Sequence, residues 1–173
     1  VMAVDVSIFT VRGGILEVLL VEMKKEPYMD SWALPGGLIE AHETADKAVE
    51  RHLFSRTGLK DISLEQLYTF SRVDRDPFGR VVSVAYFALI EGAEVENGCR
   101  WFPVHKLPKL AYDHREIVEL AIERLKSKLA YTNIVYNLLP HEFTLSDLQN
   151  VYEIILEKRL DKRNFRKKAL SLS

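Results

Sequence analysis

Two adjacent glycines and a cluster of arginines in the first half of the chain are suited to recognising a phosphorylated ligand. Gly36 and Gly37 lack side chains, which lets backbone N–H groups come close to phosphate oxygens. Three arginines flank a turn at 74–80, and arginine binds a diphosphate through forked hydrogen bonds. The alternatives are an exposed loop of alternating charge for the arginines and a core position for the aromatic ring at 101. The expected ligand-binding residues are Gly36, Gly37, Arg72, Arg75, Asp76, Arg80 and Trp101.

A second set of residues lies at fixed spacing between Gly37 and Leu59. Five residues separate Gly37 from Glu43, and seven separate Glu43 from Arg51. This arrangement resembles the Nudix box, G-x5-E-x7-R-E-U-x-E-E-x-G-U, in which U is a bulky apolar residue. The matching positions are Gly37, Glu43, Arg51, Leu53, Gly58 and Leu59. The resemblance implies the Nudix fold, an α/β/α sandwich around a mixed sheet, with the box as loop, helix and loop.

Three positions of the box depart from the pattern, because His52, Ser55 and Arg56 stand where Nudix hydrolases carry metal-binding glutamates. These positions share one helix face, since they are spaced i, i+3 and i+4. Pyrophosphate cleavage needs hard cations that prefer carboxylate oxygens. An arginine about 4 Å from a dication would cost on the order of several kcal/mol at an effective dielectric of about 20. Although Glu43 and Arg51 are retained, we expect no catalytic residues, no metal site and no cofactor.

The alternative interpretation of the box is an enzyme. A Nudix hydrolase of ADP-ribose-like nucleoside diphosphates with residual or displaced catalytic residues would show turnover that depends on Mg²⁺. The loss of the glutamate pair argues against this alternative.

The last third of the chain has the pattern of a DNA-binding unit. Residues 158–168 carry seven basic residues and one acidic residue, a net charge of +6 in a chain whose total is −1. Apolar residues at helical spacing predict helices over 145–156 and 161–172 joined by a short turn, which is a helix-turn-helix arrangement. The candidate DNA-binding residues are Thr144, Ser146, Gln149, Lys162, Arg163, Asn164, Arg166 and Lys167. For single residues, the alternative to DNA contact is helix capping or simple exposure to solvent. For the basic helix as a whole, the alternative partner is an acidic protein.

Nearly the whole chain resembles the Nudix-related transcriptional regulators, which fuse a Nudix-like effector domain to a winged helix-turn-helix. The resemblance lies in segments 74–77, 81–83, 110–114, 138–149 and 160–168. It implies a bacterial regulator that senses ADP-ribose or a related nucleotide sugar or sugar, and that controls NAD-biosynthesis or carbohydrate genes through a double-stranded DNA operator. Two such units related by a dyad read a palindrome, so we expect a homodimer. The family's wing hairpin is not found, so we expect the winged helix-turn-helix to be C-terminally incomplete.

The apolar pattern also predicts the elements that must position these residues. Strands are expected over 2–11, 15–23, 63–73, 81–91 and 99–104, and helices over 44–57, 114–129 and 132–139. The expected fold is α+β, with a Nudix-like domain over 1–112, a linking helix over 113–129 and a helix-turn-helix domain over 130–173. Because the linking helix starts beside the predicted ligand site, we expect it to transmit ligand binding to the DNA-binding domain.

The composition is that of an ordinary globular protein, with 47% apolar and 28% charged residues among 173. This balance does not match intrinsic disorder. No run of eighteen apolar residues is present, so no membrane span or membrane partner is expected. The single cysteine, Cys99, excludes an intramolecular disulfide framework and fits a cytoplasmic location. No signal-peptide pattern is seen, and we expect both ends of the chain to be trimmed.

Overall fold

A mixed sheet forms the centre of the first two thirds of the protein. The computed structural model describes residues 1–96 and 98–172. Within them, the strands are β1 (Met2–Arg12), β2 (Ile15–Glu22), β3 (Trp32–Ala33), β4 (Gly36–Leu38), β5 (Glu65–Phe70), β6 (Val82–Leu89) and β7 (Cys99–Pro103). Their order is β3-β2-β1-β6-β5, while β4 pairs with β1 and β7 pairs with β2. The pair β1–β6 is parallel and the other pairs are antiparallel, which confirms the predicted mixed sheet.

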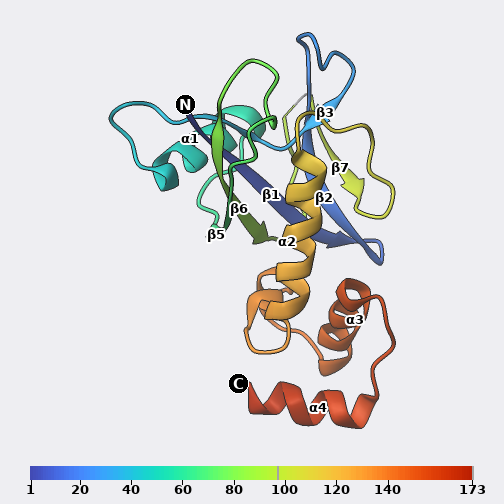
Figure 1. Ribbon diagram of the computed structural model, residues 1–173. Helices are drawn as coiled ribbons and strands as arrows, with labels where there is room; N and C mark the ends of the chain where they lie inside the picture. Colours follow the sequence, from blue (N-terminus) through green and yellow to red (C-terminus); the bar gives the residue numbers. More distant parts are fainter. Residues whose placement is uncertain (97, 173) are drawn as a thin grey trace.

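The sheet lies between helix α1 (Ala45–Thr57) and helix α2 (His114–Lys128). Along β1, Val4, Val6 and Ile8 join the apolar cluster that contains α1, while Phe9 joins the cluster that contains α2. Both faces of β1 are therefore covered, so residues 3–10 are all buried, including the polar side chains of Asp5, Ser7 and Thr10. Figure 1 shows α2 crossing the sheet and continuing toward the C-terminal helices. The layers are those of the predicted α/β/α sandwich.

Local signals in the sequence set both ends of α1. Thr44 Oγ1 accepts a hydrogen bond from the N–H of Lys47 at 3.3 Å, as expected of an N-cap. At the other end, Gly58 has a left-handed φ of 76°, and its N–H donates to the Phe54 carbonyl at 2.8 Å. Glycine adopts this conformation without a Cβ clash, so it ends the helix. The helix predicted over 44–57 is confirmed.

Most other predicted elements are present with slightly shorter bounds. The β1–β2 hairpin turns at Gly13 and Gly14, whose φ values of 59° and 76° belong to a two-residue turn. The predicted helix over 132–139 is instead a short 3₁₀ helix, η1 (Ile134–Leu138). Its five residues end shortly before Pro140, which lacks an N–H and cannot continue a helix.

The described chain after α2 contains helices and loops. Helix α3 (Leu145–Leu156) begins with a capping box in which Thr144 and Asp147 each accept a backbone hydrogen bond from the other. Glu157 has a left-handed φ of 55°, and the chain then turns into α4 (Lys162–Ser171). These two helices confirm the predicted helix-turn-helix elements. No helix in the described ranges is long and apolar enough to cross a membrane.

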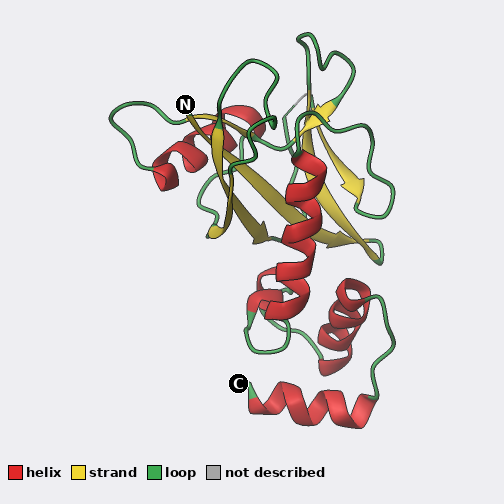
Figure 2. Ribbon diagram, in the orientation of Figure 1, coloured by secondary structure: helices red, strands yellow, loops and turns green. Residues whose placement is uncertain are grey.

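One apolar core joins the sheet to the C-terminal helices. The far end of α2 and η1 lie between them, as Figure 2 shows. This core contains residues from the sheet, α2, η1, α3 and α4, including Phe9, Leu16, Ile117, Leu125, Val135, Leu148, Ile155 and Phe165. The Nudix-like part and the helical part are therefore packed together as one body.

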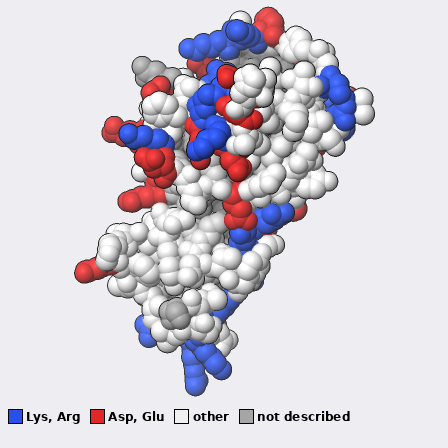
Figure 3. All heavy atoms as spheres, turned by 90° about the vertical axis from the view of Figure 1, so that its left-hand side faces the viewer, with Lys and Arg blue, Asp and Glu red and all other residues white. Residues whose placement is uncertain are grey.

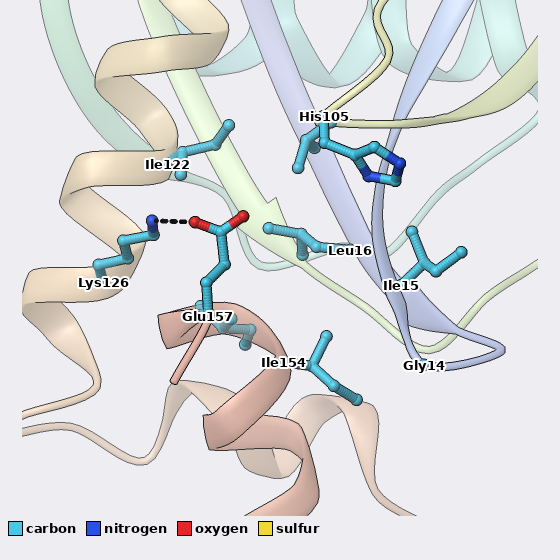
Figure 4. A pocket seen from close by; sticks show the side chains of 10 residues that line it. Gly14, Ile15, Leu16, His105, Ile122, Lys126, Ile154 and Glu157 are labelled. Carbon is cyan, nitrogen blue, oxygen red and sulfur yellow. Dashed lines mark hydrogen bonds and ion pairs between the residues drawn. The ribbon is translucent and has the colours of Figure 1, made fainter. Parts of the chain in front are cut away.

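A pocket of about 330 Å³ lies at this junction, between the β1–β2 hairpin, α2 and α3 (Figure 4). Its walls include Ile15, Ile122 and Ile154, one from each of these elements. Beside them, Lys126 Nζ of α2 lies 3.1 Å from Glu157 Oε2 at the end of α3. The junction is thus incompletely filled at this point and is bridged by one partly exposed ion pair.

Candidate functional site

A cleft of about 560 Å³ opens where β4, the end of α1, the loop after β5 and the start of α2 meet. This volume is in the range of small-molecule sites. The lining includes four of the seven predicted ligand-binding residues, Gly36, Gly37, Arg75 and Asp76. It also includes two of the three altered box positions, Ser55 and Arg56, and the cations Lys24 and Lys25. Segments far apart in the sequence thus form one polar cleft.

The two glycines are required by crowding within the protein. β4 pairs with β1 so that Gly36 lies opposite Asp5 and Gly37 lies opposite Val4. A Cβ at Gly36 would overlap the Val4 carbonyl, and a Cβ at Gly37 would overlap the ring of His52. The sequence predicted a close approach of ligand to backbone, whereas the structure shows a close approach of protein neighbours at both positions.

Two retained box residues bind each other. Arg51 Nε donates to Glu43 Oε2 at 3.0 Å, and the Glu40 N–H donates to Glu43 Oε1 at 2.9 Å. The hydrogen bond from Arg51 is the main cause that lowers the pKa of Glu43 to about 2. Arg51 also donates to the Leu38 carbonyl at 3.2 Å. This pair therefore fastens the loop before α1 to the helix.

The altered box positions give the cleft wall a cationic character. Ser55 and Arg56 line the cleft from α1. His52 Nε2 lies 2.8 Å from the Leu38 carbonyl, which only accepts hydrogen bonds, so this ring nitrogen carries a proton and does not ligate metal. Among the described residues, no group of three or more His, Cys, Asp or Glu is placed to hold a metal ion. Ser55 Oγ donates to the His52 carbonyl at 3.2 Å, so the guanidinium of Arg56 is the donor that this helix face offers to an anion.

Arg75 reaches the cleft from within a buried ion cluster. Its Nε and Nη2 donate to the two carboxylate oxygens of Asp113 at 2.9 and 2.7 Å, and Nη2 lies 3.5 Å from Asp5 Oδ2. No more than 8% of any of these three side chains is exposed. The forked guanidinium is thus already paired. Its contacts join the loop after β5 to β1 and to the residue that precedes α2.

His114 and Ser83 complete this cluster. Ser83 Oγ donates to Asp5 Oδ2 at 2.6 Å, and His114 Nε2 lies 3.3 Å from Asp5 Oδ1. The Leu34 N–H donates to His114 Nδ1 at 2.9 Å, so Nδ1 is the unprotonated ring nitrogen. Burial acts to raise the pKa of Asp5, but His114, Ser83 and Arg75 outweigh it and hold that pKa below its usual value. The start of α2 is therefore tied to the sheet beneath the cleft.

The other three predicted ligand-binding residues lie outside the described lining of the cleft. Arg72 pairs with Asp74 at 2.8 Å and with Glu116 of α2 at 2.6 Å. Arg80 donates to the Ser71 carbonyl at 2.7 Å. Trp101 is buried, and its Nε1 donates to the Ala93 carbonyl at 3.1 Å, which is the core role weighed as the alternative. Of the three arginines predicted to clamp a diphosphate, Arg75 alone belongs to the described lining of the cleft.

His114 lines the cleft, as expected of a linking helix that starts beside the predicted ligand site. Tyr112 also lines the cleft, but the sequence did not single it out as a ligand-binding residue. Asp5 could have been found from the sequence, because a carboxylate between valines in a predicted buried strand requires a hydrogen-bonding or charged partner. Cys99 also lines the cleft, and its thiol donates to the Arg56 carbonyl at 3.0 Å.

A second candidate surface lies on α4. Phe165 and Ala169 are buried against α3, with the Phe165 ring 5.1 Å from that of Tyr152. The opposite face is exposed and holds the predicted residues Lys162, Arg163, Asn164, Arg166 and Lys167. Figure 3 shows basic side chains projecting at the end of the molecule where Figure 1 places α4. This arrangement suits contact with nucleic-acid phosphates and base edges.

The three predicted DNA-binding residues around α3 differ in their surroundings. Thr144 caps the helix, and Ser146 is exposed in its first turn. Gln149 Nε2 donates to the Leu160 carbonyl at 2.9 Å and to Glu153 Oε1 at 3.2 Å. Glu153 in turn accepts from the Leu160 N–H at 2.8 Å. Gln149 and Glu153 thus hold the turn between α3 and α4.

Comparisons with known proteins match both parts of the chain. Residues 1–121 match the family described as NUDIX domain, and residues 135–173 match the NrtR DNA-binding winged helix domain. The ADPR responsive transcriptional repressor NtrR of Acinetobacter baylyi is 36% identical over 179 residues, covering 98% of this chain and 72% of that protein. The ADP-ribose pyrophosphatase of Methanocaldococcus jannaschii is 36% identical over 115 residues, covering 61% of this chain and 68% of that protein.

A solved structure shares the whole architecture. NrtR of Shewanella oneidensis, crystallised with a 27mer DNA, superposes with a TM-score of 0.88 at 32% identity, covering 98% of this chain and 82% of that chain. The match includes the sheet, α2 and the C-terminal helices, because it extends over nearly the full length. The chain belongs to the family of Nudix-related transcriptional regulators, in which a NUDIX domain is joined to an NrtR-type DNA-binding winged helix domain.

Proposed function

We propose that the protein is a ligand-responsive bacterial transcriptional regulator. Its Nudix-like part binds ADP-ribose, or a related nucleotide sugar or sugar, and thereby controls operator binding by the C-terminal helices. The observation that carries this proposal is the position of α2. His114 at its start lines the cleft, and Leu125 near its end lies in the core that α3 and α4 share. One helix therefore extends from the cleft to the core on which α3 and α4 pack.

Basic side chains of the cleft support retention of a diphosphate. Arg56, Lys24 and Lys25 supply positive charge to a lining that also contains the carboxylates of Asp5, Glu22, Asp76 and Glu96. We keep Gly36, Gly37 and Asp76 as ligand contacts and assign Arg75 the role of positioning α2. The similarity to an ADPR-responsive repressor and to an ADP-ribose pyrophosphatase supports ADP-ribose as the first ligand to test.

The exposed face of α4 is the proposed recognition surface for double-stranded DNA. Lysines and arginines there bind phosphates or guanine, while Asn164 has the groups that read adenine. Two chains related by a dyad would place two such helices on a palindromic operator, so we propose a homodimer. A regulator of bacterial genes acts where the DNA is, which implies a cytoplasmic location.

Hydrolysis of ADP-ribose is the second candidate function, and the similarity to a pyrophosphatase favours it. The altered α1 face opposes it, because a guanidinium at position 56 repels the metal that such cleavage requires. We therefore propose that the chain is not an efficient hydrolase. Purified protein with ADP-ribose and Mg²⁺ or Mn²⁺ is expected to turn over more slowly than about 1 per second. Turnover at or above this rate would contradict the proposal.

Operator binding with and without ADP-ribose tests the regulatory function. Fluorescence anisotropy with promoter fragments from the protein's own gene neighbourhood measures the Kd, with a shuffled fragment as control. We expect sequence-selective binding and a change of about 5- to 150-fold in operator Kd at saturating ADP-ribose. The absence of selective DNA binding would leave an acidic protein partner as the better interpretation of α4.

A further inference from the structure

Tyr112 lies on the cleft wall in a backbone conformation that is unfavourable for its side chain. Its φ is 52°, in the left-handed region. Large residues with a Cβ occupy this region only where the surrounding structure fixes them, and such outliers cluster at functional sites. Tyr112 is followed directly by Asp113 and His114, the N-cap and first residue of α2. The strained residue thus connects the cleft to the start of this helix.

Contacts on both sides hold the Tyr112 backbone in place. The Ala111 N–H donates to the Trp32 carbonyl at 2.8 Å, and the Ala111 carbonyl accepts from the His114 N–H at 3.2 Å. On the other side, the Asp113 carboxylate is bound by Arg75. Because its neighbours are anchored in the sheet and in the buried cluster, Tyr112 cannot relax without moving one of them.

The Tyr112 ring stands between two other rings. Its centroid lies 4.5 Å from that of Tyr28 and 5.2 Å from that of His114. Tyr28 belongs to the segment between β2 and β3 that also supplies Lys24 and Lys25 to the cleft. Burial and then the charge of Asp76 raise the pKa of the Tyr112 hydroxyl, which agrees with a hydroxyl near a cleft carboxylate. The three rings form a continuous path from the cleft wall to α2.

We propose that Tyr112 is the positioning residue through which an occupant of the cleft acts on α2, an inference that rests on the function proposed above. A base or sugar face packed against Tyr112 changes its contact with Tyr28. Because Tyr112 cannot move without moving one of its anchored neighbours, this displacement passes to Asp113 and His114 and then to the helix axis. A ligand can shift α2 from one arrangement to another only if it binds the two arrangements with different affinity. Packing against Tyr112 supplies this difference in affinity.

Four variants of the full chain test this role. Tyr112→Asn removes the ring but keeps a residue type that tolerates a left-handed φ. Tyr28→Ala removes the stacking partner and leaves Tyr112 in place. Tyr112→Phe retains the ring, and Tyr68→Asn is a matched control at an exposed tyrosine on β5. Calorimetry measures the Kd for ADP-ribose, and anisotropy measures the operator Kd without and with saturating ADP-ribose.

The diagnostic quantity is the factor by which saturating ADP-ribose changes the operator Kd, because saturation removes any effect of weaker ligand binding. We expect this factor to be at least about fivefold smaller in Tyr112→Asn and Tyr28→Ala than in the unaltered chain. In Tyr112→Phe and Tyr68→Asn we expect the factor of the unaltered chain. An unaltered factor in both Tyr112→Asn and Tyr28→Ala would overturn the inference. If melting shows that Tyr112→Asn is unfolded, the Tyr28→Ala factor decides alone. No response to ADP-ribose in the unaltered chain would instead refute ADP-ribose as the ligand of the proposed function.

Discussion

Asp5, Arg75, Asp113 and His114 are buried charged or titratable residues that depend on one another for their hydrogen bonds. Removing a charge from such a cluster costs more than the lost contact, because its partner stays buried without compensation. Arg75 reaches the cleft, but its Nε and Nη2 already donate to Asp113, which supports the proposed role of positioning α2.

The first prediction concerns Arg75. Arg75→Met leaves two buried carboxylates without their guanidinium, so we expect the free energy of unfolding to fall by about 3–5 kcal/mol. Urea denaturation measures this change. Arg72→Met is the matched control, since about half of each side chain in its pair with Glu116 is exposed. The control is expected to change stability by no more than about 1 kcal/mol. Equal, small losses in both variants would refute a stabilising role for the cluster.

The second prediction is a pH dependence at Glu43. Its pKa is lowered from 4.5 to about 2 in the folded protein. The stabilisation is therefore complete above the unfolded value and is lost as the pH falls toward the folded value. Glu43→Gln is expected to flatten the decline of unfolding free energy between pH 4.5 and 2, measured by urea titration at each pH. Glu142→Gln, on an exposed loop, is the control, and an equally steep decline in both variants would count against the Arg51 pair.

These two residues also show what the sequence alone can predict about a site. Glu43 and Arg51 lie eight residues apart within one loop and helix, so their spacing was sufficient to bring them together. Arg75 lies 70 residues from Asp5 and 38 from Asp113. Only the order of strands and the path of α2 place them in contact, and no local pattern specifies that.

Among the helices, α3 and α4 begin at N-cap residues that can be recognised from residue type. Thr144 and Asp161 accept hydrogen bonds from the backbone N–H groups three residues later, as N-caps do. The turn between the helices also depends on Gln149 and Glu153, which bind Leu160. The caps were predictable from residue type, whereas the role of Gln149 required the geometry of the turn.

The third prediction concerns the exposed face of α4. Arg163→Ala removes one cation from the proposed DNA surface without touching Phe165 or Ala169, so we expect weaker operator binding at unchanged melting temperature. If Arg163 contacts a phosphate, the slope of log Kd against log salt falls by about 1. Anisotropy at several salt concentrations measures both effects. Lys60→Ala, an exposed change beyond α1, is the control, and equal effects in the two variants would remove α4 from the interface.

For the whole molecule, the apolar core extends across the division that the pattern of strands and helices predicts. That pattern, a mainly strand-forming part followed by a helical part, predicts a Nudix-like domain over 1–112, a linking helix over 113–129 and a helix-turn-helix domain over 130–173. Apolar residues of the sheet, α2, α3 and α4 belong to one cluster. The order of elements is visible in the sequence, whereas burial across a junction depends on tertiary contacts.

The fourth prediction follows from this shared core. Thermal unfolding is expected to be one cooperative transition, with the same midpoint by tryptophan fluorescence and by circular dichroism. Both tryptophans, Trp32 and Trp101, lie in the sheet, while the helical signal includes α3 and α4. Leu148→Ala, a buried change in α3, should lower both midpoints together. Two separate midpoints, or a shift confined to circular dichroism, would show that the parts unfold independently.

Cys99 supplies the cleft with a chemical reporter. It is the single cysteine of the chain, it lines the cleft, and burial raises the pKa of its thiol. Little of it is therefore thiolate at neutral pH, and reaction with an alkylating reagent is slow and depends on access through the cleft. The rate at which this one sulfur is labelled, followed by mass, consequently distinguishes a filled cleft from an empty one in the unmodified protein.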